Sequence, residues 1–564
     1  MSDVEQERAG SLGRLKWSLL VVAFLAPASL LYQGLSLVQI SIAHVEVQLV
    51  ILAALATSAC VGGLLWRARS SIRTILLTLI VGIFLEVSIG FQSDFQRLLA
   101  SNAARPLFSA VLASLLIVIP LALLWALLRM LEPFEAEILA AFFGVVFLST
   151  IMTQPPPKVG GAQSRVEPQP LADTGRDEPV IIHLIFDELL APEAVDRTSE
   201  EGIATYRAMR EFADRFGFRL YGRVYSRHFF SARSIRNLMN GQYEGLSASR
   251  DLNFSKFTKM DRSAYLDEKI RQGYRVSIYA TSHIDFCSHP GISSCEVYDS
   301  FDPQWTEGGW QSQVGLKARV GYVLYTVLQG FSKSYVVSHV SGVVVDLVLD
   351  GREPGVGGLP KRFDVQGFPR WFDHVSRSIV NQPRGTLVLA HFMVPHAPYL
   401  LTEHCGLSGN PGHGYYLGRR FGPDPMEVDR HRRVASSKYL AQAQCVFKKL
   451  EEFMESIEDS ERFADAQIVI HGDHGSRISV GNILEDYSEI DFIANYATFF
   501  AVRSPSVEEG YDCRFVALPR LFAETMGEPS SRWLPESTTI FVHPSKDAKG
   551  FREVLMPRFE CRGQ

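Results

Sequence analysis

The stretch QIVIHGDHGSR, from Gln467 to Arg477, decides the fold, because it sets a short β-branched run directly against Asp-His-Gly. The apolar run predicts a buried strand. The residues after it have two interpretations. They form an ordinary turn, or they present two metal ligands, Asp473 and His474, at the carboxyl end of a strand.

Four other apolar runs predict strands, and they alternate with helical patterns. They are VIIHLIF (180–186), YRVSIYA (274–280), TLVLAHF (386–392) and ATFFAV (497–502). Between two of the strands, residues 436–460 carry apolar side chains at three- and four-residue spacing, which predicts one face of a helix. Near-continuous apolar strands between helices indicate an α/β fold with a parallel sheet covered on both faces. Ligands in such sheets gather at the carboxyl ends of the strands.

The first 153 residues hold most of the apolar excess of a 564-residue chain that is 47% hydrophobic. Five apolar segments stand out there: Trp17–Val38, Val47–Trp66, Ile72–Phe91, Leu107–Met130 and Ala136–Met152. The first four have the length of roughly 20 residues that a bilayer core requires, and the fifth is marginal. Buried core helices are the alternative, but four long runs in succession favour membrane spans. We therefore expect a five-helix transmembrane domain over 1–153, a Pro- and Gly-rich linker over 154–178 and an exported domain over 179–564.

Positive charges and cysteines agree on the orientation. Three basic residues, Arg8, Arg14 and Lys16, precede the first span, and three arginines, Arg67, Arg69 and Arg73, lie between the second and third. The loops of the other side hold only Arg97 and Arg105. The positive-inside rule then places the N-terminus in the cytoplasm and the large domain outside. Cys60 lies in a span, and the other six cysteines, an even number, predict up to three disulfides in an oxidising compartment. Cys287 with Cys295 is the pair we expect, and the other pairings stay open.

Residues Tyr322–Leu349 fit this organisation poorly, because the segment is apolar but interrupted by Ser, Lys, Gly and His. A sixth span would return the C-terminus to the cytoplasm and split the domain. Helices near the membrane face and plain core remain as alternatives.

Three expected strand ends carry side chains suited to a metal. They are Asp187 and Glu188 after the first strand, His391 and His396 in VLAHFMVPHAPY, and Asp473 and His474. Carboxylate oxygens and imidazoles suit Zn²⁺ or Mn²⁺. Each motif alone is more typical of a helix N-cap or a satisfied histidine, but their joint occurrence favours a metal site.

The segment YSRHFFSARSIRNLMNGQY, from Tyr225 to Tyr243, offers a hydroxyl at Ser231. A serine at a helix start is often only an N-cap. A hydroxyl coordinated to a cation, however, deprotonates more easily and becomes a nucleophile at neutral pH. Arg233 and Arg236 nearby are suited to an anionic group.

These residues resemble the alkaline phosphatase superfamily in its sulfatase-like branch. Within that branch the chain is similar to the membrane-anchored phosphoethanolamine and phosphoglycerol transferases and the lipoteichoic acid synthases. The resemblance implies five N-terminal spans and an extracytoplasmic α/β/α domain with a central, mostly parallel sheet. It also implies a metal site of Glu188, Ser231, Asp473 and His474, with Asp187 beside it and Ser231 as the nucleophile.

The resemblance implies substrate contacts as well. His396 of PHAPY matches the histidine that meets the substrate phosphate or the leaving group, so we expect it to be catalytic. His391 is a weaker match, and we assign it to substrate binding together with Arg233, Arg236 and Arg477.

The chain also departs from the family. Formylglycine sulfatases need a proline two residues after the modified residue, where this chain has Arg233, so that maturation is not expected. Relatives in the transferase branch usually carry threonine in place of Ser231. Where many relatives have a histidine for a second metal, this chain reads Asn495-Tyr496, so the expected cofactor is one divalent metal, Zn or Mn.

The function implied is a two-step transfer at the bacterial inner membrane. A phospholipid donor, phosphatidylethanolamine or phosphatidylglycerol, passes its head group through phospho-Ser231 to an envelope glycan or lipid. Two alternatives stay open: a membrane-tethered phosphatase, phosphodiesterase or sulfatase-like hydrolase, and a catalytically inactive lipid sensor or interaction protein. A net charge of −5 without a basic stripe gives no case for nucleic-acid binding.

Overall fold

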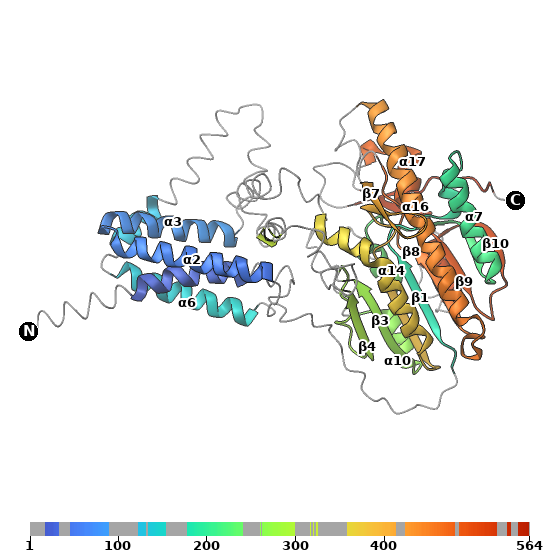
Figure 1. Cartoon of the computed structure of the whole chain (residues 1–564), viewed down its shortest axis with the longest axis horizontal. Coiled ribbons are helices and arrows are strands. Elements are labelled where there is room, and N and C mark those ends of the chain that lie inside the picture. The colour runs from blue at the N-terminus through green and yellow to red at the C-terminus, as the bar shows by residue number, and fades with distance from the viewer. Residues whose placement is uncertain are drawn as a thin grey trace, which may run out of the picture. The chain divides into compact units, whose positions relative to one another are not determined.

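The chain divides into two compact units in the computed structural model (Figure 1). One unit comprises residues 1–162 with 311–358, and the other comprises residues 163–310 with 359–564. Apart from a few isolated positions, the structure describes residues 17–32, 45–89, 122–130, 134–153, 178–240, 262–281, 283–298, 358–412, 424–479, 484–526, 538–542 and 551–562. Almost all of Tyr322–Leu349 lies outside this described part.

The first unit is helical wherever it is described. Its elements are helices at 17–32 and 122–130, α2 (Val45–Arg67), α3 (Ser70–Ile89) and α6 (Glu135–Thr153). Phe84 of α3 meets Phe143 of α6 edge to face, with ring centroids 4.9 Å apart. Among the described residues, α2 is the helix whose length and composition suit a membrane crossing. Most of the expected span Leu107–Met130 is outside the described residues, so the five-span arrangement stays a prediction.

The second unit is built on a central sheet of eight described strands. Their order is β10 (Gly510–Ala517), β2 (Arg219–Tyr225), β9 (Phe500–Arg503), β8 (Gln467–Gly472), β1 (Ile181–Phe186), β5 (Thr386–Phe392), β3 (Arg275–Thr281) and β4 (Ser294–Tyr298). Strand β9 is antiparallel to its neighbours β2 and β8, and the other pairs are parallel. The mostly parallel sheet predicted from the sequence is confirmed, and all five predicted strands belong to it.

Helices cover both faces of this sheet, because alternate strand residues enter two separate hydrophobic clusters. Ile182 and Leu184 of β1 belong to one cluster, and Ile181 and Ile185 to the other. The first cluster includes side chains of α7 (Glu200–Arg215), α14 (Gly358–Val380) and α16 (Pro425–Glu458). The second includes side chains of α8 (Ser231–Asn240), α10 (Ala264–Arg271) and α18 (Leu518–Met526). The unit is therefore a three-layer α/β/α domain.

Smaller elements complete the domain. They are the hairpins β6 (Tyr399–Leu401) with β7 (Leu407–Gly412) and β11 (Thr539–Val542) with β12 (Arg552–Leu555), the helix α17 (Glu489–Tyr496), and the 3₁₀ turns η1 (Pro192–Ala194), η2 (Glu461–Phe463) and η3 (Leu484–Asp486). The hairpin β6–β7 follows the turn that carries His396.

Three disulfides link the six cysteines of this domain: Cys287–Cys295, Cys405–Cys445 and Cys513–Cys561. The predicted pair is confirmed, and Cys60 of the helical unit is free. Disulfides of this number are typical of an extracytoplasmic domain.

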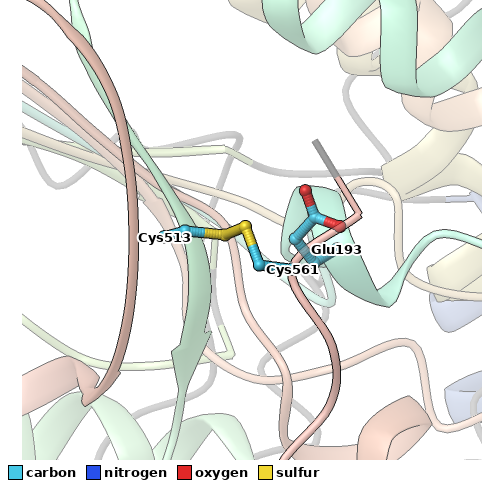
Figure 2. Close-up of side chains that lie close together, drawn as sticks. All are labelled: Glu193, Cys513 and Cys561. Atoms are coloured by element: carbon cyan, nitrogen blue, oxygen red, sulfur yellow. A yellow bond between two sulfur atoms is a disulfide. The ribbon is translucent and has the colours of Figure 1, made fainter. Parts of the chain in front are cut away.

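Glu193 lies beside the Cys513–Cys561 bond, and Figure 2 shows the three side chains together. The sulfurs are joined to each other, so they offer no thiolate to a metal. Glu193 instead accepts hydrogen bonds from the Tyr511 hydroxyl (2.5 Å) and from the backbone N–H of Arg562 (2.8 Å). The carboxylate and the disulfide thus hold the C-terminal segment to the domain.

Candidate active site and metal centre

The predicted ligands meet at one edge of the sheet. Strands β8, β1 and β5 are parallel neighbours, and their register aligns Phe186 with Gly472 on one side and Phe392 on the other. Their carboxyl ends therefore lie level. Asp187 and Glu188 follow β1, His391 is the penultimate residue of β5, and Asp473 and His474 follow β8; all five are fully buried.

The two glycines of GDHG are required by close backbone contacts. A Cβ on Gly472 would lie 2.3 Å from the Leu189 carbonyl oxygen, and one on Gly475 would lie 2.2 Å from the Ala494 carbonyl oxygen. Real Cβ atoms do not approach backbone so closely, so only glycine fits at either position. Gly472 thus lets the chain pack directly against the loop after β1, and Gly475 lets it pack against the backbone of α17 (Glu489–Tyr496).

Ser231 reaches the same point from another element. It is the first residue of α8, and its Oγ donates a hydrogen bond to Asp187 Oδ2 at 3.2 Å and lies 3.3 Å from His474 Nε2. The Nδ1 of His474 is 2.9 Å from the Gly475 carbonyl oxygen. Because a carbonyl only accepts, Nδ1 carries the proton and Nε2 presents its lone pair toward Ser231.

Asp473 links two loops of the site through hydrogen bonds to its carboxylate. Its Oδ1 accepts hydrogen bonds from the backbone N–H of Glu188 (3.0 Å) and of His474 (2.8 Å). Glu188 has φ +70°, in the left-handed region, and a non-glycine residue there costs roughly 1–3 kcal/mol. Asp473 thus helps to hold Glu188 in a conformation that it would not adopt alone.

Some buried atoms at this edge of the sheet have no hydrogen-bond partner among the described residues. They include Asp473 Oδ2 and both ring nitrogens of His391. Such atoms are costly in a folded protein, and an ion is one of the few explanations for them. Burial, with the nearby His471 and His474, lowers the pKa of His391 to about 3, so its ring is neutral and able to ligate.

The ligand atoms fall into two overlapping sets that share Asp187. Asp187, Glu188 and His474 form one set, and Asp187, His391 and Asp473 form the other; within each set the ligand atoms lie within 4.8 Å of one another. Carboxylate and imidazole donors of this kind suit Zn²⁺ or Mn²⁺. The sequence placed His391 among the substrate contacts, whereas the geometry places it among the candidate ligands. The feature that could have indicated a ligand role for His391 is its position near the end of β5, where it pairs with Ile185 of β1.

His396 and Arg477 both face Glu188. The Nδ1 of His396 donates to the Ala397 carbonyl oxygen (2.5 Å), which leaves Nε2 3.6 Å from Glu188 Oε1. Arg477 places Nε 2.6 Å and Nη2 2.5 Å from that same oxygen. Arg477 therefore neutralises a ligand carboxylate, and the substrate contact expected of it stays a prediction.

The other expected substrate contacts lie on α8, the helix that begins with Ser231. Arg233 and Arg236 share α8 with Ser231, and the Arg233 guanidinium packs 4.3 Å over the ring of Phe551. Their role toward a substrate stays a prediction. Tyr496, which follows Asn495, donates its hydroxyl to the Phe541 carbonyl oxygen at 2.7 Å.

Sequence comparisons find no matching family model and no matching curated protein. Among solved structures, the chain is similar to the C-terminal periplasmic domain of EcEptC from Escherichia coli (11% identity, covering 68% of this chain and 94% of that chain, TM-score 0.36). It is similar to the phosphonate monoester hydrolase of Agrobacterium radiobacter (14% identity, 65% and 80% coverage, TM-score 0.39). A protein in the alkaline phosphatase superfamily from Vibrio parahaemolyticus also matches (11% identity, 68% and 76% coverage, TM-score 0.35).

One of these matched structures is described as a protein in the alkaline phosphatase superfamily. Because these TM-scores lie below 0.5, the functional proposal rests on the geometry of the site itself.

His391→Ala is expected to weaken Zn²⁺ binding at least tenfold, because even residues behind the ligands change metal affinity by about 10–100-fold. Asp473→Ala should weaken Zn²⁺ binding by a similar factor. The measurement is the Zn²⁺ affinity of the full chain in detergent. His374→Ala is the matched control, since His374 pairs with Glu296 on another part of the domain. If His391→Ala binds Zn²⁺ as tightly as wild type, His391 is not a ligand.

Burial raises the pKa of Asp473 to about 6, although the Glu188 N–H and other donors oppose the shift. The carboxyl in an unfolded chain has a pKa of about 3.9. In the metal-free protein Asp473 therefore takes up a proton on folding between these values, and its contribution to stability is lost as pH rises from about 4 through about 6. We expect the unfolding free energy of wild type, relative to Asp473→Asn, to fall over that window. A pH-independent difference contradicts the assignment.

Proposed function

We propose that this protein is a membrane-anchored phosphotransferase of the alkaline phosphatase superfamily. In this proposal Ser231 takes a phospholipid head group as a covalent phosphoester and passes it to an envelope acceptor. The observation that carries the proposal is the placement of Ser231 Oγ between Asp187 and His474, within a buried set of carboxylates and imidazoles.

A divalent cation bound by these residues would lower the pKa of the serine hydroxyl and offset charge on the phosphoryl oxygens. Asp187 Oδ2 accepts the hydrogen bond of Ser231 Oγ and is placed to take its proton. Ser231 lies at the start of α8, where the backbone N–H groups of the first turn favour an anion. The protein thus provides a nucleophile, a proton acceptor and a phosphate-binding helix end at one point.

In the first half-reaction the Oγ–P bond forms and the bond from phosphorus to the diacylglycerol oxygen breaks. His396, protonated on both ring nitrogens at this point, donates from Nε2 the proton that the leaving oxygen needs. In the second half-reaction the acceptor hydroxyl gives its proton to His396 Nε2 and the acceptor oxygen attacks phosphorus. The Oγ–P bond then breaks, and Asp187 returns the proton to Ser231 Oγ. Arg477 holds Glu188, which faces His396, so that both remain in place through the two steps.

A lipid donor is supported by the layout of the chain. Helix α2 has the length and composition of a membrane span, and the three disulfides are typical of an oxidising compartment outside the cytoplasm. An enzyme anchored in this way meets lipid head groups directly. If water replaces the acceptor in the second half-reaction, the same site makes a phosphodiesterase.

The test uses the full chain in vesicles of phosphatidylethanolamine and phosphatidylglycerol, with Zn²⁺ or Mn²⁺. We expect diacylglycerol to form, and Ser231→Ala to abolish its formation by at least about 10³-fold, as for loss of a nucleophile. Ser437→Ala, on α16, is the matched control, since Ser437 bonds only Glu201 among its described contacts.

The second product distinguishes the reactions. Addition of envelope lipid or glycan should give a modified acceptor if the protein is a transferase, whereas free phosphorylated head group identifies a hydrolase. Absence of diacylglycerol from metal-loaded wild type contradicts the proposal and favours the sensor alternative.

A further inference from the structure

Helix α16 carries three side chains that contact the loops of the site from behind. Tyr439, Gln442 and Cys445 follow one another at three-residue intervals, so they share one face of the helix. All three are buried. None of them is a candidate ligand or nucleophile.

Tyr439 contacts the loop after β1. Its hydroxyl donates to the Glu188 carbonyl oxygen at 2.7 Å and accepts from the Leu190 N–H at 3.0 Å. Burial raises the pKa of Tyr439, so the hydroxyl keeps the proton that it donates. The residue that Tyr439 holds is Glu188, whose backbone is left-handed. Without the hydroxyl, a buried carbonyl and a buried N–H beside the candidate ligand lose their partner.

Gln442 contacts the turn that carries His396. Its Nε2 donates to the carbonyl oxygens of Pro395 (3.1 Å) and His396 (3.0 Å). Its Oε1 accepts from the N–H groups of Leu400 (2.8 Å) and Leu401 (3.0 Å). One side chain therefore uses its full amide hydrogen-bonding capacity on this turn.

The turn needs such a side chain because of its composition. Pro395 and Pro398 have no N–H, so regular backbone pairing cannot fix this segment. Cys445, one turn beyond Gln442, holds the next loop through its disulfide to Cys405. Tyr439 and Gln442 thus hold two separate loops of the site, and Cys445 holds the loop that follows the second of them.

We infer that Tyr439 and Gln442 are positioning residues of the site, Tyr439 for the ligand Glu188 and Gln442 for the acid–base residue His396. The inference rests on the roles given to Glu188 and His396 in the proposed function. Neither residue touches the reacting atoms, so each acts through the group that it holds.

The first test measures Zn²⁺ affinity of the full chain by competition with a chelator. Tyr439→Phe should weaken binding about tenfold, the lower end of the effect of residues behind a ligand. Gln444→Leu is the matched control, because Gln444 lies on the same helix and contacts Glu201 and Thr205 of α7 instead. Wild type that binds neither Zn²⁺ nor Mn²⁺ refutes the proposed function. Wild type that binds while Tyr439→Phe binds equally well refutes this inference alone.

The second test needs no substrate. Diethyl pyrocarbonate modifies accessible neutral histidines, and His396 is only 2% exposed. Mass spectrometry should show slow modification of His396 in wild type and Gln444→Leu and at least tenfold faster modification in Gln442→Leu. His404, which is well exposed, serves as the reference for equal reagent. Unchanged reactivity of His396 in Gln442→Leu overturns the role of Gln442.

Buried His471 reports whether each variant is folded, because it reacts only if the sheet opens. If His471 is modified in Gln442→Leu, Gln442→Glu is tested instead, and the same faster modification of His396 is expected. That variant keeps the acceptor oxygen for Leu400 and Leu401 and loses both donors to the turn.

Discussion

The site depends on one carboxylate oxygen, Asp473 Oδ1, which binds the backbone N–H of Glu188 and of His474. This oxygen joins the loop after β1 to the loop after β8. The join is possible because the two strands are parallel neighbours in register and because Gly472 admits the Leu189 carbonyl. The loop that carries Glu188 and the loop that carries Asp473 and His474 therefore hold each other in position.

This arrangement is accompanied by two energetically unfavourable features, strained backbone and buried polar atoms without a partner. Glu188 and Arg477 both have positive φ, and buried atoms of Asp473 and His391 have no hydrogen-bond partner in the part of the chain that the structure describes. Strain and unpaired polar atoms persist only where surrounding structure determines them fully. Here that structure is a sheet buried on both faces, α16 behind the loops, and the disulfides. A bound cation would convert the unpaired atoms into ligands, so metal binding and local stability are coupled.

The sequence was most informative where burial is complete. Strands β1, β5 and β8 are apolar almost throughout, because both faces are covered, and so their positions in the chain could be predicted. Strands β2 and β10 were missed, since RLYGRVY and GYDCRFVA interleave charged and polar residues near the edge of the sheet. Helix α16 begins at Pro425, earlier than the apolar periodicity alone indicated, with Asp424 as its N-cap.

Within the site, the sequence predicted which residues take part but not which of them contact one another. Asp187, Glu188, Ser231, Asp473 and His474 come together as expected. The pairing of Arg477 with Glu188 and the grouping of His391 with Asp187 and Asp473 depend on side-chain directions at the sheet edge, which no spacing in the sequence records. The same holds for Tyr439 and Gln442, which look like ordinary members of an amphipathic helix.

The central claim is that Ser231 is the nucleophile, and its most direct test is the trapped intermediate. The metal-loaded full chain would be mixed briefly with phospholipid vesicles, quenched in acid and digested for mass spectrometry. If Ser231 is the nucleophile, the peptide that contains it gains the mass of a phosphorylated head group, and this gain disappears in Ser231→Ala. Turnover of lipid with that peptide unmodified, or with the modification on another residue, would contradict it.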